Sequence, residues 1–312
     1  MMTTTQPITD WHVQQLDDLT GKRYLITGGN TGIGYEAAAH LRRANADVFI
    51  ASRSSSKGDQ AVASLAQVEG RGATEFIQLD LASLDSIRAA DDAIRQHTDG
   101  LDAVINNAGV MQTPQQQTAD GFELQFGTNH LGHFMLNHLI FDLIKARSGR
   151  IVPVSSIAHR RADRINFDDP MFTDDYSPST AYGQSKLANL MYGFELARRL
   201  DAADSSVISV TCHPGYSATN LQSTGPTGFF KQLYKVTNAL MAQSAEAGAV
   251  PEVLAAAGTE ARNGAYYGPT RLGDTRGPVG DCSVSGAAKD EAAASRLWSL
   301  SEELLGVKFT IS

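Results

Sequence analysis

A tyrosine and a lysine one helical turn apart could exchange a proton with a substrate. Tyr182 and Lys186 stand in the run Tyr-Gly-Gln-Ser-Lys, and this spacing places both side chains on one face of a helix. A phenol with a pKa of about 10 is a poor base at neutral pH, but a nearby ammonium stabilises the phenolate and lowers that pKa. Reduction of a carbonyl needs such a proton on oxygen and a hydride on carbon, which a nicotinamide can supply.

A glycine-rich run near the start of the chain predicts where a dinucleotide would bind. It follows the apolar run Tyr24-Leu25-Ile26 and precedes a helical stretch from Tyr35 to Arg43, so it lies at a turn from strand to helix. Small residues let the backbone approach a pyrophosphate, and the first N–H groups of the helix bind anions. The residues that we expect to contact the cofactor here are Gly28, Asn30, Thr31, Gly32, Ile33 and Gly34.

Length, charge and cysteine usage narrow the classes of protein that the chain can be. The 312 residues carry a formal net charge of −8 at pH 7 and no run of Lys or Arg, which argues against nucleic acid or an anionic membrane as the main partner. Two cysteines are too few for a disulfide framework, and residues 1–18 lack a signal-peptide pattern. The most apolar helix candidate, 131–144, is interrupted by polar residues and cannot span a bilayer. We expect a cytoplasmic protein with small-molecule partners.

Short apolar runs alternate with helical patterns along the chain. Continuous apolar runs such as Val48-Phe49-Ile50 are typical of a parallel sheet that helices cover on both faces. The predicted strands are Arg23–Thr27, Asp47–Ser52, Thr74–Leu79, Asp102–Asn106, Arg150–Ser155, Val207–Cys212 and Ala265–Tyr267. The predicted helices are Gly32–Arg43, Gly58–Val68, Leu84–His97, Leu131–Ala146, Ala181–Leu200, Ala245–Ala257 and Ala287–Leu305. This pattern predicts an α/β fold, a Rossmann-like doubly wound sheet of about seven mostly parallel strands, with ligands at the carboxyl ends of the strands.

The same alternation of strands and helices predicts one domain over residues 1–312, with 1–20 as an N-terminal arm and 286–312 as a C-terminal helix and tail. Two late segments, 155–180 and 213–243, are long, poorly periodic and rich in Pro, Gly, Asp and Ser, so both are expected to border the substrate. The second is the predicted substrate lid. Within the first, residues 158–180 are expected to form a polar wall near the pocket and to govern substrate choice, through Arg160, Arg161, Asp163, Arg164, Asp168 and Asp169.

Pro153 departs from the pattern of the fifth predicted strand. A central strand position would lose a ladder donor there, because proline has no N–H. We therefore expect either a bulge at this residue or a nitrogen that points out of the sheet.

The order of these motifs resembles the single-domain short-chain dehydrogenase/reductase family over nearly the whole chain. The glycine-rich run, Asn107-Ala108-Gly109, Asn129, Ser156 and the Tyr182–Lys186 pair stand on matching elements. The resemblance implies an NAD(P)-dependent oxidoreductase. Four phrases further resemble its retinol-dehydrogenase-like branch: Asn129-His130-Leu131-Gly132-His133-Phe134, Ser185-Lys186-Leu187-Ala188-Asn189, Tyr266-Tyr267-Gly268-Pro269 and Arg296-Leu297-Trp298.

The resemblance implies a catalytic set of Asn129, Ser156, Tyr182 and Lys186. Ser156 would hold the substrate oxygen through its hydroxyl, where negative charge grows during hydride transfer. Lys186 would tune Tyr182 and bind the nicotinamide ribose. Asn129 would bend its helix and hold a water that links Lys186 to solvent. The family's active serine is the second of two adjacent ones, so Ser155 is expected to be structural.

Further cofactor contacts are implied by the resemblance, in addition to Tyr182 and Lys186. They are the segment beside the adenine ribose, Asn107, Ala108 and Gly109, the adenine contact of Asp80 and Leu81, and the nicotinamide carboxamide contact of Thr219.

The end of the second strand decides which dinucleotide is preferred. There an acidic side chain would bond the ribose 2′-OH of NAD(H), whereas an arginine would accommodate the 2′-phosphate of NADP(H). The strand ends in Ala51-Ser52-Arg53, and Asp47 lies at its opposite end. We expect NADP(H) as the preferred cofactor, with Arg53 as its contact and NAD(H) as the alternative.

Three functions remain open at this point. The leading hypothesis is a carbonyl reductase that interconverts a ketone or aldehyde with an alcohol. The alternatives are reduction of a C=C bond or an elimination on the same scaffold, and a non-catalytic dinucleotide-binding regulator. A lipophilic substrate is also open, because residues 213–243 contain apolar side chains of either core or lid character.

Two structural questions accompany these hypotheses. The first is whether helices 131–146 and 181–200 pair copies of the chain into a homodimer or homotetramer, or whether the C-terminal tail covers them. The second concerns three histidines on one predicted helix, for which we expect packing or exposure. No carboxylate or Cys completes a recognisable ligand spacing with them, so no metal site is predicted at His130, His133 and His138.

Overall fold

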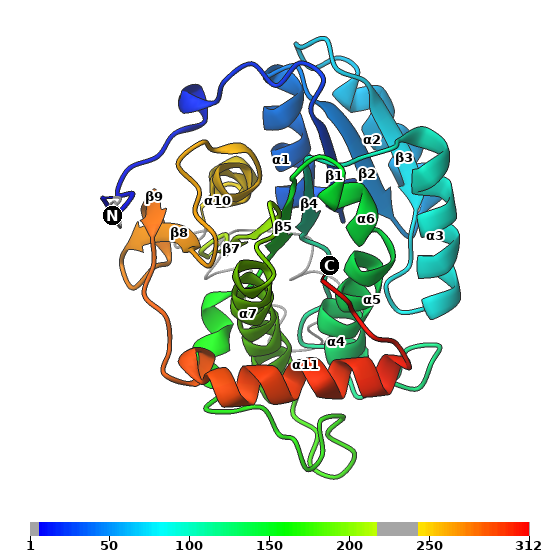
Figure 1. Ribbon diagram of the computed structural model, residues 1–312, viewed down its shortest axis with the longest axis vertical. Coiled ribbons are helices and arrows are strands. Elements are labelled where there is room, and N and C mark those ends of the chain that lie inside the picture. The colour runs from blue at the N-terminus through cyan, green and yellow to red at the C-terminus, as the bar shows by residue number, and fades with distance from the viewer. Residues whose placement is uncertain (1–5, 217–242, 312) are drawn as a thin grey trace.

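The computed structural model describes residues 6–216 and 243–311, where strands and helices alternate (Figure 1). The strands are β1 (Arg23–Thr27), β2 (Asp47–Ser52), β3 (Thr74–Gln78), β4 (Ala103–Asn106), β5 (Arg150–Pro153), β6 (Ile208–Ser209), β7 (Thr211–Cys212), β8 (Tyr266–Arg271) and β9 (Arg276–Asp281). The α-helices are α1 (Gly32–Arg43), α2 (Ser55–Leu65), α3 (Leu84–His97), α4 (Leu124–Phe126), α5 (Gly132–Leu139), α6 (Phe141–Lys145), α7 (Pro178–Ala202), α10 (Ala245–Ala257) and α11 (Glu291–Leu305). Shorter turns of helix are η1 (Val13–Gln15), the π turn η2 (Gly127–Leu131), η3 (Ile157–Arg161) and η4 (Ala287–Lys289).

Six parallel strands form the main sheet, in the order β3-β2-β1-β4-β5-β6. Two apolar clusters cover its two faces: one packs α1, α2 and α10, and the other packs α3, α5 and α7. Because both faces are covered, β2 is buried from Val48 to Ala51. The predicted α/β doubly wound fold is therefore confirmed. Strand order reverses between β1 and β4, where sheets of this kind bind ligands.

The predicted count of about seven strands needs a correction. The last predicted parallel strand, 207–212, is two short strands, β6 and β7, and β7 belongs to a second sheet in the order β7-β8-β9. β9, which pairs antiparallel with β8, was not predicted from the sequence. A parallel bridge between Val154 and Cys212 joins the second sheet to the end of β5.

Pro153 explains where that parallel strand is interrupted. The predicted bulge is absent from the regular pairing of β5 with β4, and the nitrogen of Pro153 faces β6 and β7 instead of pointing out of the sheet. On this side Val210 N donates to the Ile151 carbonyl at 3.0 Å, and Ser155 N donates to the Cys212 carbonyl at 2.8 Å. The ladder bond that should lie between these two hydrogen bonds would be donated by the N–H of residue 153, which proline lacks. The ladder therefore loses one bond next to Val210, between β6 and β7.

The single helix predicted over 131–146 is also wrong. The helical segment begins earlier, with α4, passes through the π turn η2 and continues as α5. It breaks at Ile140, where ψ is 11°, before α6 begins. The wide turn contains Asn129, whose side chain binds the backbone of Val110. A π turn, which is a common cause of a kink, thus lies at the residue where the family resemblance implied a bend.

The C-terminal helix α11 lies across α7 and beside α5 (Figure 1). Trp298 stacks on Tyr192 of α7 with ring centroids 5.8 Å apart. After the helix, Phe309 packs edge-on against Phe134 of α5, with ring centroids 5.5 Å apart. The tail therefore covers these two helices, which was one of the two arrangements that the sequence left open.

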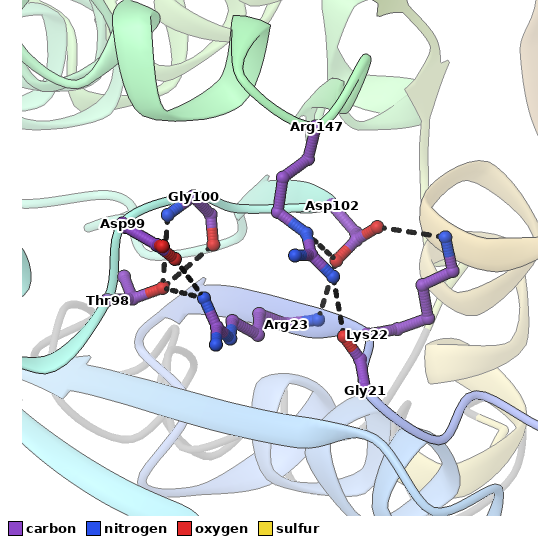
Figure 2. A network of polar contacts seen from close by, with 8 residues as sticks. All are labelled: Gly21, Lys22, Arg23, Thr98, Asp99, Gly100, Asp102 and Arg147. Atoms are coloured by element: carbon purple, nitrogen blue, oxygen red, sulfur yellow. Dashed lines mark hydrogen bonds and ion pairs between the residues drawn. The ribbon is translucent and has the colours of Figure 1, made fainter.

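Asp102 joins several segments at the amino ends of the strands (Figure 2). Its mostly buried carboxylate accepts hydrogen bonds from Arg23 N at 2.9 Å, Arg147 Nε at 2.8 Å and Lys22 Nζ at 3.1 Å. Arg147 also donates to the Gly21 carbonyl. These contacts fix β1 against β4 at the amino ends of the strands, at the opposite end from the carboxyl ends where ligands bind.

No helix in residues 6–216 and 243–311 is long and apolar enough to cross a membrane.

One carboxyl group in the core lacks a hydrogen-bond partner. Glu252 lies on α10 with its side chain fully buried, and neither carboxyl oxygen has a partner in the described part of the chain. Burial raises the pKa of Glu252 to about 8, against the attraction of the Lys186 ammonium. We therefore expect the folded protein to keep this proton at neutral pH.

Replacing Glu252 by Gln should make stability less sensitive to pH. The unfolded chain releases the Glu252 proton above its ordinary pKa of 4.5, whereas the folded protein keeps it up to about 8. Rising pH through this window therefore destabilises the wild type. We expect the free energy of unfolding of Glu252→Gln, relative to wild type, to increase by about 3 to 4 kcal/mol between about pH 5 and about pH 8. Urea unfolding followed by circular dichroism measures it.

Glu303 on α11 is exposed and provides the matched control. Glu303→Gln removes the same carboxyl group without changing a buried one, so its stability difference from wild type should stay nearly constant. The same constant difference for Glu252→Gln would contradict the prediction.

Candidate functional site

A cavity of about 700 Å³ lies at the carboxyl ends of the parallel strands. Its walls come from the turn after β1, the ends of β2, β3 and β4, η3, the start of α7 and the turn after β7. Gly34 and Asn129 are not part of its wall, and Thr219 and residues 217–242 of the predicted lid lie outside the described residues. The predicted site residues that line the cavity are Gly28, Asn30, Thr31, Gly32, Ile33, Arg53, Asp80, Leu81, Asn107, Ala108, Gly109, Ser156, Tyr182 and Lys186.

The glycines after β1 let two backbone segments approach each other. Gly28 has a φ of +69°, a conformation that favours glycine. A Cβ on Gly34 would lie 2.5 Å from Asn107 Nδ2 and 2.7 Å from the Gly28 carbonyl oxygen. The same Asn107 amide donates to the Thr27 carbonyl at 2.7 Å. Gly34 therefore allows the turn to pack against the segment after β4, and it is not part of the cavity wall.

The start of α1 fits an anionic group. Thr31 is the N-cap residue, but its side chain makes no capping hydrogen bond to the first N–H groups of the helix. Gly32 and Ile33 of this first turn line the cavity. Such N–H groups and the positive end of the helix dipole bind phosphate oxygens.

Two hydroxyls on the cavity wall also fit a polar ligand. Ser52 Oγ and Thr128 Oγ1 are buried, and within the described ranges neither has a hydrogen-bond partner. A buried polar atom needs such a partner. These hydroxyls and the uncapped first turn of α1 are polar groups that a dinucleotide would satisfy, so the cavity fits such a cofactor.

Lys186 brings a positive charge to the inner wall of the cavity. It is 4% exposed, its Nζ donates to the Val154 carbonyl at 3.1 Å, and it lies 5.9 Å from the centroid of the Tyr182 ring. Burial lowers the pKa of Lys186 to about 8, so the side chain is still mostly an ammonium at neutral pH. The helix that positions both residues begins with the Ser177 cap and Pro178 in its first turn.

The two adjacent serines have different surroundings. Ser155 is buried, and its hydroxyl donates to the Lys186 carbonyl at 2.7 Å. Ser156 is half-buried at the start of η3, and its Oγ accepts from Ala158 N at 3.2 Å. Both residues line the cavity. The hydroxyl proton of Ser155 is already used, whereas that of Ser156 can be donated to a substrate oxygen.

Asn129 and His133 hold the cavity wall from behind. Asn129 binds Val110 twice, since Oδ1 accepts from its N–H at 2.8 Å and Nδ2 donates to its carbonyl at 2.9 Å. His133 contacts the Asn129 carbonyl through Nδ1 and Thr27 Oγ1 through Nε2, at 2.9 and 2.8 Å. A carbonyl only accepts, so Nδ1 carries the proton and Nε2 accepts from the Thr27 hydroxyl. Burial lowers the pKa of His133 to about 4, which keeps this packing histidine neutral.

Lys57 and Thr128 are among the residues of the cavity wall that were not predicted from the sequence. Lys57 lies in the first turn of α2, which begins at Ser55, whereas the predicted helix began at Gly58. The N-cap is Ser54, whose Oγ accepts from Lys57 N at 3.4 Å. A serine in this position is a signal that could have placed the helix start correctly.

Comparison with known proteins agrees with this geometry. A family model described as short chain dehydrogenase matches residues 22–227. Retinol dehydrogenase 14 of Homo sapiens is 36% identical over 307 residues, which cover 92% of this chain and 87% of that protein. Retinol dehydrogenase 13 of Homo sapiens is 36% identical over 299 residues, which cover 93% of this chain and 86% of that protein.

Solved structures give the same assignment. An uncharacterized protein from Mycobacterium paratuberculosis superimposes with a TM-score of 0.81 and 37% sequence identity, covering 97% of this chain and 100% of that one. A short-chain dehydrogenase from Burkholderia cenocepacia, solved in complex with NADP, has a TM-score of 0.61 and 24% identity over 80% of this chain and 96% of that one, and shows the shared fold. The chain therefore belongs to the short-chain dehydrogenase family, in its retinol-dehydrogenase-like branch, and is an NAD(P)-dependent oxidoreductase that acts on alcohols or carbonyl compounds.

Proposed function

We propose that the protein interconverts a ketone or an aldehyde with the corresponding alcohol and prefers NADP(H). The observation that carries the proposal is the convergence of Ser156, Tyr182 and Lys186 on one cavity. A bound nicotinamide supplies the hydride in reduction and accepts it in oxidation. The protein then has to manage the charge and the proton on the reacting oxygen.

Each of the three side chains has a role at that oxygen. Tyr182 donates its proton during reduction and takes a proton back during oxidation. The nearby Lys186 ammonium stabilises the phenolate form of Tyr182. Ser156 donates a hydrogen bond to the substrate oxygen, and this bond strengthens as negative charge develops in the transition state. Asn129 fixes Val110 in the cavity wall. We also propose that Asn129 holds a water that links Lys186 to solvent.

The remaining cavity residues would hold the cofactor along the sheet. The first turn of α1 would bind the pyrophosphate through its N–H groups. The other proposed contacts are Asp80 and Leu81 with the adenine, Asn107, Ala108 and Gly109 with the adenine ribose, and Thr219 with the nicotinamide carboxamide.

Two cations support the preference for NADP(H). Arg53 and Lys57 both line the cavity where β2 ends and α2 begins. The neighbouring wall residues are Ser52 and Ser54, so no carboxylate in this stretch would bond a ribose 2′-OH. Asp47 stands at the opposite end of β2, where it accepts from Ala73 N at 2.8 Å.

The substrate is proposed to have an apolar body. Met111, Ile157 and Ala158 line the cavity, and two of the relatives are named after retinol, a lipophilic alcohol. The cytoplasmic location and the homodimer or homotetramer predicted from the sequence stay predictions.

Tyr182→Phe should lower turnover roughly 10²- to 10⁴-fold, because it removes the proton donor and leaves the ring in place. NADPH binding should survive, since most of the proposed cofactor contacts lie on the other walls of the cavity. Steady-state reduction of a panel of aldehydes and ketones measures the first effect, and a fluorescence titration with NADPH measures the second. Tyr35→Phe, at a tyrosine that is not part of the cavity wall, is the control, and unchanged turnover in Tyr182→Phe would refute the proton-donor role.

Arg53→Ala should reduce the preference for NADPH over NADH by roughly tenfold or more, because it removes a cation expected beside the 2′-phosphate. Adding Lys57→Ala should reduce that preference further. The measurement is kcat/KM for each nucleotide at a fixed carbonyl substrate, with the exposed Arg88→Ala on α3 as a control. Higher efficiency with NADH than with NADPH, together with a ratio that Arg53→Ala leaves unmoved, would rule out the assignment.

A further inference from the structure

Two adjacent arginines near Ser156 have different surroundings. Arg160 donates to the Gly273 carbonyl and Ser283 Oγ and forms an ion pair with Asp274, so it ties η3 to the β8–β9 hairpin. Arg161 lines the cavity, and the described ranges provide it with no ion pair and with one hydrogen bond, to Ser179 Oγ at 3.2 Å. A guanidinium has five N–H donors. Most of the hydrogen-bonding capacity of Arg161 is therefore available to a ligand.

Arg161 ends η3, and its hydrogen bond to Ser179 places its guanidinium beside the start of α7, one turn before Tyr182. Ser179, Tyr182 and Lys186 follow one another on one face of this helix at spacings of three and four residues. Ser179 therefore lies about 4.5 Å before Tyr182 along the helix axis, and Lys186 lies about 6 Å after it. A Cβ on Gly183 would lie 3.4 Å from Arg161 Cβ, so the arginine stays close to this part of α7.

This order along the helix separates two cationic groups. Lys186, which is proposed to bind the nicotinamide ribose, follows Tyr182 along α7. Arg161 contacts the helix before Tyr182, through Ser179. The phosphates of the cofactor are expected at α1 and at Arg53, which belong to other walls of the cavity. Arg161 is therefore a cation that the cofactor does not account for, about one helical turn from the proton donor.

We propose that Arg161 binds an anionic group of the substrate, so that the preferred substrate is an aldehyde, ketone or alcohol that also carries a carboxylate, sulfate or phosphate. This inference rests on the proposed function of the site. A guanidinium binds such an anion through paired, charge-assisted hydrogen bonds. The apolar wall of Met111, Ile157 and Ala158 suits the carbon chain between the two ends. Arg161 thus determines which carbonyl compounds are accepted, without acting on the reacting oxygen.

Matched pairs of substrates test this role. Aliphatic aldehydes that end in a carboxylate are compared with their methyl esters at equal chain length, and NADPH oxidation is followed by absorbance. The wild type should favour the acid over the ester by roughly tenfold or more in kcat/KM, mainly through KM. Arg161→Gln should lose most of this preference, whereas Arg161→Lys should keep part of it because the charge remains.

Arg164 supplies a matched control. It is exposed in the same segment but does not line the cavity, so Arg164→Gln removes the same charge and should keep the wild-type ratio of acid to ester. The Arg161 proposal is overturned if the wild type treats acid and ester alike, or if Arg161→Gln and Arg164→Gln lower the ratio equally.

A binding measurement separates this proposal from the proposed function. If neither acid nor ester is reduced, the carbonyl-reductase proposal fails. The Arg161 proposal is then decided by the rise in melting temperature that a saturating aliphatic carboxylate produces with NADPH present. A rise in the wild type and in Arg164→Gln, but not in Arg161→Gln, supports the anion site, and equal behaviour of all three overturns it.

Discussion

The contact between the Lys186 ammonium and the Val154 carbonyl is the interaction on which the site depends. Removing an ammonium from water is costly unless polar groups replace the water. Here the end of β5 provides the carbonyl, and the neighbouring Ser155 hydroxyl donates in the opposite direction to the Lys186 carbonyl. These two hydrogen bonds hold α7 against β5. As a result, Ser156 on one element and Tyr182 on the other line the same cavity.

A second set of contacts supports the opposite wall. The Thr27 hydroxyl at the end of β1 accepts from Ala108 N and is bonded to His133, which in turn holds the Asn129 carbonyl. Asn129 then fixes Val110. The turn after β1, the segment after β4 and the bent helix are therefore one connected unit. In such a unit, changing a residue that never touches a ligand can still displace one that does.

The elements that the sequence predicted correctly are those with strong local signals. β1, β2, α1, α3 and α10 have the predicted bounds, because continuous apolar runs or regular helical patterns define them. β9 was missed because Arg-Gly-Pro-Val-Gly-Asp has little strand character, and its pairing depends on β8 and on the distant Trp11, which bridges to Val279. The split between β6 and β7 likewise depends on Pro153, more than 50 residues away in the chain.

The predicted part of the cavity wall has strong local signals for the same reason. The glycine-rich turn, Ser156 and the Tyr182–Lys186 pair belong to motifs whose spacing carries the information. Lys57 and Thr128 belong to no such motif, and only the packed structure shows that they line the cavity. The difference between Arg160 and Arg161 also depends on a distant part of the chain. The β8–β9 hairpin and Ser283 bind Arg160, whereas the described residues offer Arg161 only Ser179.

The helix α11 has a consequence for assembly. Trp298 and Phe309 occupy the aromatic surface that α5 and α7 would otherwise present to a second copy of the chain. Two copies could meet through these helices only after α11 had been displaced and its aromatic contacts had been replaced. Any self-association that leaves each protomer intact must therefore use a different face of the molecule.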